Sequence, residues 1–138
     1  MVLLIDTNIL LDVCLKREPF LQMSRDALLA ATNNNDNLYF PASSVTDIFY
    51  FLRKDKYNRE TIIKYLLHIT KRVKLVKVDS DIIFKSFASN INDLEDAVID
   101  EVADSVHADY ILTRDKKGFS NGKTKAISPS EFLEEYSK

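Results

Sequence analysis

Short apolar runs of strand length alternate with amphipathic helical stretches along this chain. Val2–Ile5 and Tyr110–Leu112 are continuous apolar runs, the pattern of parallel strands that are buried on both faces. Further strands are predicted at 38–40, 73–78 and 126–127. Because helical segments separate these strands, we predict an α/β fold, a three-layer sandwich with a mainly parallel central sheet.

The spacing of apolar residues also predicts the helices between these strands. The first follows Asp6 and is broken at Arg17-Glu18-Pro19, and the others are expected near 20–32, 45–52, 59–71, 80–89, 93–106 and 129–136. In the second helix, Leu21, Leu28 and Leu29 are expected to face inward. No linker or repeat divides the 138 residues, so we predict a single domain over residues 1–138.

Four aspartates lie near the edges of these buried elements. Asp6 ends the first apolar run, Asp115 follows a second one, and Asp47 and Asp96 lie near predicted helix starts. A carboxylate in such a place is costly unless something compensates it. Ligands of parallel sheets bind at the carboxyl ends of the strands, and four aspartates gathered there would repel one another unless they shared a divalent cation. Hard oxygen ligands of this kind suit Mg²⁺ or Mn²⁺.

Each aspartate also has a simpler explanation. The alternatives are an N-cap at Asp6, capping boxes at Ser44-x-x-Asp47 and Asp93-x-x-Asp96, and closure of the Lys116-Lys117-Gly118 turn by Asp115. Capping residues need not converge in space, whereas the ligands of one metal must. Convergence therefore separates the two explanations.

The charges of the chain are divided between two neighbouring segments. Nine basic and two acidic residues between Arg53 and Lys77 give a net charge of +7, and nine acidic residues and one basic residue between Asp79 and Asp109 give −8. A phosphate-binding surface beside a metal centre would show this pattern. Two solvated helix faces of opposite sign would show it equally well.

Three segments, in order, resemble the motifs of the PIN-domain family. Val2-Leu-Leu-Ile-Asp-Thr-Asn-Ile-Leu-Leu-Asp12 is similar to the opening motif, Asp93-Leu-Glu-Asp-Ala97 to the D-x-x-D-A motif, and Ala108-Asp-Tyr-Ile-Leu-Thr-Arg-Asp115 to the closing motif. The family's second acid is usually glutamate, and here the aligned residue is Asp47. Aspartate is one methylene shorter, which would convert a direct metal ligand into a water-mediated one.

The resemblance implies a metal-dependent endoribonuclease that hydrolyses single-stranded RNA with Mg²⁺ or Mn²⁺ and forms no covalent enzyme intermediate. It assigns the metal to Asp6, Asp47, Asp96 and Asp115, with Thr113 orienting a water or a phosphate oxygen and Asn8 fixing Asp6. The Arg53–Lys77 segment would then follow the RNA backbone.

The resemblance to VapC-type toxins further implies the toxin of a type II toxin–antitoxin pair, with an antitoxin partner and a homodimeric state. Phe49-Tyr50-Phe51 has more aromatic surface than one helix face buries, which fits a dimer or partner surface or packing beneath the next helix.

Two other classes of protein remain as alternatives. A Mg²⁺-dependent phosphatase of the haloacid-dehalogenase type also places an aspartate after its first strand, but its Asp-x-Asp motif would need an acid where Asn8 stands. A PIN-like binding or scaffold module without catalysis is the second, and acids at all four positions argue against it. Mn²⁺-dependent cleavage of RNA, without activity on a phosphomonoester, would separate the nuclease from both.

The sequence also bears on the location of the protein. Cys14 is the only cysteine, so no internal disulfide forms and a reducing compartment is expected. No apolar run approaches the roughly 20 residues that span a bilayer, and the apolar start lacks the basic region of a signal peptide. We therefore expect a cytoplasmic protein without a membrane segment.

Overall fold

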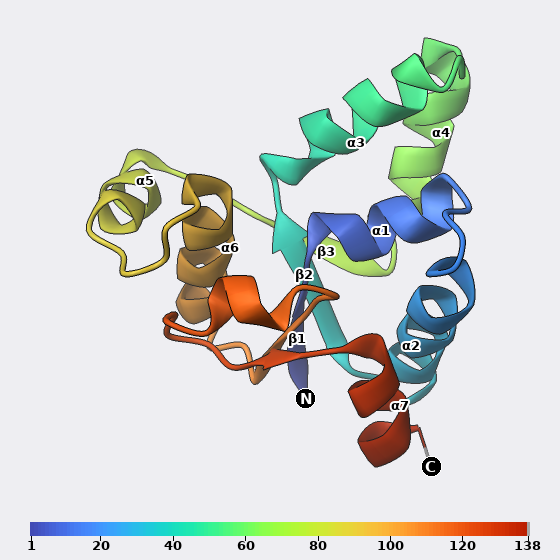
Figure 1. Cartoon of the computed structure of the whole chain (residues 1–138). Helices are drawn as coiled ribbons and strands as arrows, with labels where there is room; N and C mark the ends of the chain where they lie inside the picture. Colours follow the sequence, from blue (N-terminus) through green and yellow to red (C-terminus); the bar gives the residue numbers. More distant parts are fainter. Residues whose placement is uncertain (138) are drawn as a thin grey trace.

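A parallel sheet of five strands forms the centre of the protein in the computed structural model, which describes residues 1–137 (Figure 1). Lys138, the last residue of the predicted domain, lies outside the described residues. The strand order is β3-β2-β1-β4-β5, and every pair is parallel. The strands are β1 (Val2–Ile5), β2 (Asn37–Pro41), β3 (Val73–Val76), β4 (Tyr110–Leu112) and β5 (Ala126–Ile127).

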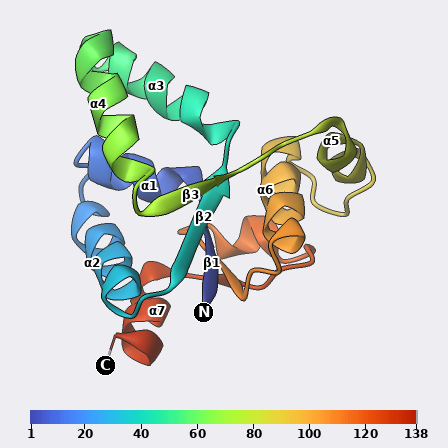
Figure 2. The same ribbon diagram turned by 180° about the vertical axis from the view of Figure 1, so that it is seen from behind.

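Helices cover both faces of the sheet, so the predicted three-layer α/β fold is confirmed (Figures 1 and 2). The helices are α1 (Thr7–Cys14), α2 (Leu21–Asn33), α3 (Ser44–Lys54), α4 (Arg59–Ile69), α5 (Ser80–Phe87), α6 (Leu94–Ser105) and α7 (Pro129–Tyr136), with a short 3₁₀ helix η1 (Lys116–Phe119). Within residues 1–137, no helix has the length and apolar character needed to cross a membrane.

Alternation along β1 divides the buried residues into two cores. Leu3 and Ile5 lie in the core beneath α1, α2, α3, α4 and α7, whereas Leu4 lies in the core beneath α5 and α6. Successive side chains of a strand point to opposite faces, so a strand covered on both sides must be apolar at every position. This accounts for the continuous apolar run at the start of the sequence.

The order of the strands brings Asp6 and Thr113 together. Ile5 pairs with Leu112, and the next residue, Asp6, donates its backbone N–H to the carbonyl oxygen of Leu112 at 3.0 Å. From β1 the chain continues to β2 and β3 on one side of β1, and β4 and β5 lie on its other side. The gap between β1 and β4 is thus the switch point of the sheet, where ligands of such folds bind.

Helix α2 differs from the sequence prediction in the residues that it buries. Its fully buried side chains are those of Ser24, Ala27 and Ala31, while Leu29 is 55% exposed. The prediction that Leu29 faces inward is wrong, because α2 packs against α1 and α7 through a stripe of small residues. Leu21 and Leu28 are only half-buried.

Candidate active site

Asp6 is a buried carboxylate at the carboxyl end of β1. It is 5% exposed and occupies the N-cap position before α1. Instead, the Thr113 hydroxyl donates to Asp6 Oδ2 at 2.8 Å. Burial raises the pKa of Asp6, the Thr113 hydrogen bond lowers it in part, and the charge of Asp115 raises it further. Backbone N–H groups of Thr7 and Asn8 at the start of α1 also lower the pKa of Asp6, so Asp6 has a capping role in addition to its contact with Thr113.

Thr113 connects Asp6 to Asp115. Its side chain is fully buried, and its Oγ1 accepts the backbone N–H of Asp115 at 2.9 Å while donating to Asp6. A hydroxyl has one proton to donate, and here Asp6 takes it. In this arrangement Thr113 orients the two acids, and its role in orienting a water or a phosphate oxygen stays a prediction.

Asp96 lies in the first turn of α6, and its carboxylate is not the cap of that helix. Asp93 is the N-cap residue, and its Oδ1 accepts the backbone N–H of Asp96 at 3.0 Å, so the capping role predicted for Asp93 is confirmed. Burial, followed by the charges of Asp93, Asp6, Asp115 and Glu95, raises the pKa of Asp96 to about 7. This carboxylate is thus surrounded by other acids.

Asp96 and Asp115 face the same small space beside Gly118. A Cβ atom at Gly118 would lie 2.8 Å from Asp115 Oδ2 and 2.9 Å from Asp96 Oδ2. The other oxygen of Asp115 accepts the Gly118 N–H at 3.2 Å, so Asp115 also closes the turn, as the alternative explanation proposed. One oxygen of Asp115 has a structural role, and the second points toward Asp96.

Asp47 lies at the margin of this group. It is exposed in the first turn of α3, where no side-chain capping bond forms, so the predicted Ser44-x-x-Asp47 capping box is absent. Asp47 and Glu95 line the same hollow of about 430 Å³, and the charge of Asp47 raises the pKa of Glu95, after burial as the larger cause. The charges that raise the pKa of Asp96 do not include that of Asp47.

The start of α3 is joined to the start of α1 by two buried hydroxyls. Thr7 Oγ1 donates to Ser44 Oγ at 2.9 Å, and both side chains are only 4% exposed. Asp47 follows Ser44 by less than one turn of helix. This hydrogen bond therefore sets the distance between the segments that carry Asp6 and Asp47.

Asn8 contacts a different residue from the one expected. Its Oδ1 accepts Arg17 Nη1 at 3.4 Å, and within residues 1–137 no hydrogen bond joins the Asn8 side chain to Asp6. Arg17 also lies over the ring of Phe51 at 5.6 Å. Asn8 lies beside the acids, and its role in fixing Asp6 stays a prediction.

The donor set suits a hard divalent cation. It consists of carboxylate oxygens from Asp6, Asp96 and Asp115, of which two face a space that a Cβ atom would fill. Within residues 1–137, no group of three or more Asp, Glu, His or Cys side chains lies close enough to enclose one ion. The acids therefore converge on one place without forming a closed ligand set.

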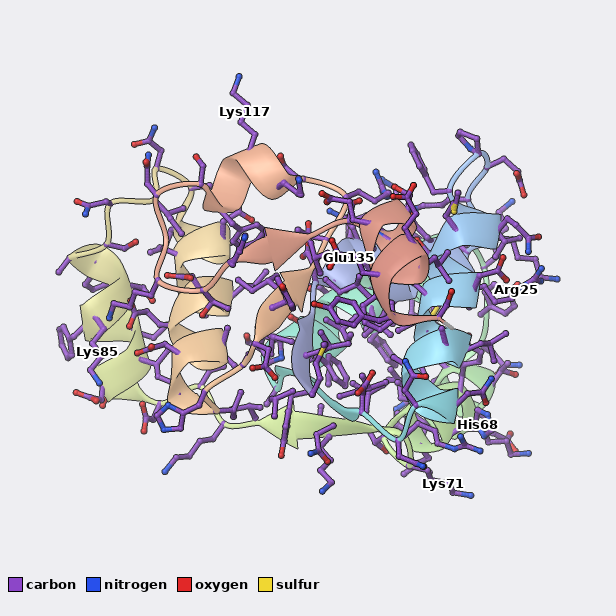
Figure 3. The ribbon with its side chains drawn as sticks, turned by 90° about the horizontal axis from the view of Figure 1, so that it is seen from below. Arg25, His68, Lys71, Lys85, Lys117 and Glu135 are labelled. Carbon is purple, nitrogen blue, oxygen red and sulfur yellow. The ribbon has the colours of Figure 1, made fainter. Side chains whose placement is uncertain are left out.

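The predicted phosphate-binding segment, 53–77, does not form one surface beside the acids. Lys71 precedes β3, and the amino ends of parallel strands lie at the edge opposite the acids. Figure 3, which views the molecule from that side, shows Lys71 and His68 there, with Arg25 nearby on α2. Lys77, which directly follows β3, lies at the carboxyl edge.

Several residues of the site were not predicted from the sequence. Glu95 stands next to Asp96, and its proximity to Asp47 depends on how α3 and α6 pack. Gly118 is one of only two glycines, and its lack of a positive φ angle indicates a spatial reason for glycine. The scarcity of glycine in the sequence was the signal that could have pointed to Gly118.

A family model described as a PIN domain matches residues 2–117. The chain belongs to the PIN-domain family. Among curated proteins, none matches the sequence significantly.

Solved structures with this PIN fold include components of toxin–antitoxin complexes. VapBC2 from Rickettsia felis, bound to a promoter DNA fragment, aligns with a TM-score of 0.73 and 16% identity over 93% of this chain and 98% of that chain. VapBC-1 from Haemophilus influenzae aligns with a TM-score of 0.69 and 18% identity over 94% of this chain and 99% of that chain. A toxin-antitoxin complex from Klebsiella pneumoniae aligns with a TM-score of 0.67 and 20% identity over 91% of this chain and 96% of that chain. At these identities the comparison shows a shared fold.

Proposed function

We propose that this PIN-domain protein is a metal-dependent endoribonuclease. The observation that carries the proposal is the convergence of Asp6, Asp96 and Asp115 at the switch point of a parallel sheet. The charge of Asp115 contributes to the raised pKa of Asp6, and the charges of Asp6 and Asp115 contribute to that of Asp96, so the folded protein holds these acids together at an electrostatic cost. A divalent cation would remove that cost, and family membership supports nuclease chemistry.

Asp6, Asp96 and Asp115 would hold Mg²⁺ or Mn²⁺, with Asp47 acting at greater distance. A divalent ion in such a site lowers the pKa of a bound water and neutralises charge on the scissile phosphate. Thr113 holds the Asp6 carboxylate and the backbone of Asp115 in a fixed relation. Water and phosphate would have to reach the open side of the site, where Asp115 is exposed.

Lysines near the acids support a phosphodiester substrate. Lys117 follows Asp115 by two residues and extends away from the body of the protein (Figure 3). Lys116 is held by Glu131 at 2.9 Å, so Lys117 is the freer of the two cations. We assign backbone phosphate contacts to Lys117 and Lys77, in place of the whole basic segment.

The same proposal includes the role of toxin in a type II toxin–antitoxin pair. It is supported by the fold shared with components of the Rickettsia felis and Klebsiella pneumoniae complexes. An antitoxin and a second copy of the chain are the expected partners. Tyr50 and Phe51 on α3, which are 59% and 36% exposed, offer apolar surface for one of these contacts.

Incubation of purified protein with single-stranded RNA and Mn²⁺ tests the nuclease. We expect cleavage that EDTA abolishes and that Asp96→Asn reduces strongly. Parallel reactions with single-stranded DNA and a phosphomonoester define the substrate class. Cleavage of DNA alone would contradict the ribonuclease, and hydrolysis of the phosphomonoester alone would favour the phosphatase alternative. Inactivity on all three substrates would support a binding module.

Induced expression in a bacterial host tests the toxin role separately. The wild type should arrest growth, and Asp6→Asn at equal protein level should not. A protein that cleaves RNA in the purified assay but leaves growth unchanged would contradict the toxin role and leave the nuclease intact.

A further inference from the structure

Asp12 is a fully buried carboxylate outside the acid cluster. It lies on α1, six residues after Asp6, and is 0% exposed. Its Oδ1 accepts Arg114 Nη2 at 3.0 Å, and its Oδ2 accepts Arg114 Nε at 2.7 Å and Ser24 Oγ at 2.8 Å. Both oxygens are therefore occupied, and the arginine contact is bidentate, the strongest type of carboxylate pair.

The helical hairpin formed by α1 and α2 holds Arg114 from several sides. Its guanidinium lies 3.8 Å from the centre of the Phe20 ring, in addition to its ion pair with Asp12. Phe20 directly precedes α2, and Ser24, which supports Asp12, is in the first turn of that helix. A planar, delocalised cation is suited to stacking and to a two-point carboxylate contact, and lysine is not.

Arg114 stands between the two residues that define the acid site from the β4 side. Thr113, before it, donates to Asp6, and Asp115, after it, faces Asp96 across Gly118. The backbone between them makes a sharp change of direction, since β4 ends at Leu112 and η1 begins at Lys116. The Arg114 side chain is the anchor that joins this turn to the α1–α2 hairpin, 102 residues away in sequence from Asp12.

We propose that the Asp12–Arg114 ion pair positions the acid site by holding Thr113 and Asp115 in place beside Asp6. The inference rests on the proposed nuclease function. In this proposal Arg114 acts through its neighbours, because Asp12 takes the Nε and Nη2 donors of the guanidinium and the Phe20 ring lies against it. This differs from a phosphate contact, which would leave the guanidinium free at the surface.

The main variant is Arg114→Ala, compared with Arg114→Lys. The matched control is Lys123→Ala, which breaks an ion pair of 2.8 Å to another buried acid, Glu101, in the second half of α6. For each protein we would measure the melting temperature in EDTA, its rise with Mn²⁺, and kcat and KM for RNA cleavage.

We expect Arg114→Ala to lower kcat about 100-fold, the effect of a shift of about 1 Å in a catalytic group, with a much smaller change in KM. The rise in melting temperature with Mn²⁺ should shrink, because the ligands no longer meet. Lys123→Ala should lose stability but keep both kcat and the Mn²⁺ response. Arg114→Lys should fold but recover only part of the rate, since it cannot make the bidentate contact.

Chemical rescue separates positioning from a general loss of stability. Millimolar guanidinium should occupy the space between Asp12 and Phe20 in Arg114→Ala and restore much of the rate, and urea, which is similar in shape but neutral, should not. A merely structural role predicts that guanidinium restores the melting temperature without restoring kcat.

Several results would overturn the inference. One is an Arg114→Ala protein with wild-type kcat and wild-type Mn²⁺ response, and another is a rise in KM with unchanged kcat, which would make Arg114 a substrate contact. If Arg114→Ala does not fold, wild-type activity in Arg114→Lys overturns it. A wild type that neither binds Mn²⁺ nor cleaves RNA overturns the function and the inference together, whereas an active wild type with an equally active variant overturns the inference alone.

Discussion

Asp100 and Asp6 are both buried carboxylates, at 1% and 5% exposure, but their surroundings differ. Asp100 accepts the backbone N–H of Lys123 at 2.9 and 3.0 Å and that of Thr124 at 3.0 Å. Asp6 receives one side-chain hydrogen bond, from Thr113, and faces the like charge of Asp115. The fold supplies donors to both oxygens of Asp100, whereas it places a like charge against Asp6.

The difference distinguishes a structural acid from a functional one. Asp12 belongs with Asp100, because three donor atoms satisfy its two oxygens. Asp96 belongs with Asp6, because burial, followed by the charges of the neighbouring acids, raises its pKa to about 7. Strongly perturbed acids that cluster at the switch point of a sheet indicate a site prepared for an external cation.

The largest expected effect comes from removing Asp100, the buried acid whose two oxygens accept hydrogen bonds. Asp100→Ala leaves the N–H groups of Lys123 and Thr124 without their acceptor, and each unsatisfied group costs about 1–3 kcal/mol of unfolding free energy. Urea denaturation should therefore show a loss of about 3 kcal/mol. The control is Asp104→Ala, an exposed acid one turn later on α6, which should be near neutral. Equal losses for the two variants would contradict the comparison.

Removing Asp6 and Asp96, whose charges are not compensated, should preserve or raise the stability in EDTA and reduce the response to Mn²⁺. In EDTA, Asp6→Asn/Asp96→Asn should melt at or above the wild-type temperature, because two sources of repulsion are gone. With Mn²⁺ at 100 times its Kd, the wild type should gain about 2.7 kcal/mol by binding linkage and the double variant little. Thermal melts in EDTA and Mn²⁺ measure both effects. A wild type indifferent to millimolar Mn²⁺ would refute the metal site.

The two glycines sharpen the comparison because each lies against one of the two kinds of acid. Gly118→Ala places a methyl group against Asp115 and Asp96, and Gly122→Ala places one 2.7 Å from Asp100 Oδ1. We expect Gly118→Ala to keep most of its stability in EDTA but lose most of its Mn²⁺ response. Gly122→Ala should show the reverse, a lower melting temperature with the Mn²⁺ response kept. Differential scanning fluorimetry with and without Mn²⁺ distinguishes the patterns.

Without metal, stability should depend on pH through Asp96. Its pKa is raised from 3.8 to about 7, so between these values the folded protein holds a proton that the unfolded chain releases. Stability is therefore highest at the acid end of this window and falls as pH rises toward 7, and the raised pKa of Asp6 acts in the same direction. Melting temperatures in EDTA from pH 5 to 8 should fall less in Asp96→Asn. If the melting temperature falls equally with pH in both proteins, groups other than Asp96 cause the pH dependence.

The smallest expected effect is at Asp47, at the margin of the site. Asp47→Glu adds one methylene and brings the carboxylate nearer to the other acids. We expect a modest strengthening of the Mn²⁺ response, with little change in stability because the position is exposed. Isothermal titration with Mn²⁺ measures it, and Asp47→Gln is the neutral control. A weaker affinity in Asp47→Glu would mean that aspartate is the better fit here.

Local patterns in the sequence were sufficient for the fold and for the position of most acids. The apolar runs Val2–Ile5 and Tyr110–Leu112 each form a strand buried on both faces, and the acids after them lie at the carboxyl edge. The periodicity of apolar residues predicted α7 at Pro129–Tyr136 without error. Such features depend on a residue and its near neighbours, so they can be read from the chain.

Tertiary structure alone decided which acids are satisfied. Asp12 and Arg114 are 102 positions apart, and Asp100 meets the backbone of Lys123 and Thr124 only because the loop before β5 packs against α6. The same holds for the space at Gly118 and for the exposure of Leu29. The sequence determined that acids stand at the ends of buried strands. Strand register and helix packing decided the donors that reach each one, because a hydrogen bond requires contact within about 3 Å and no local pattern encodes that distance.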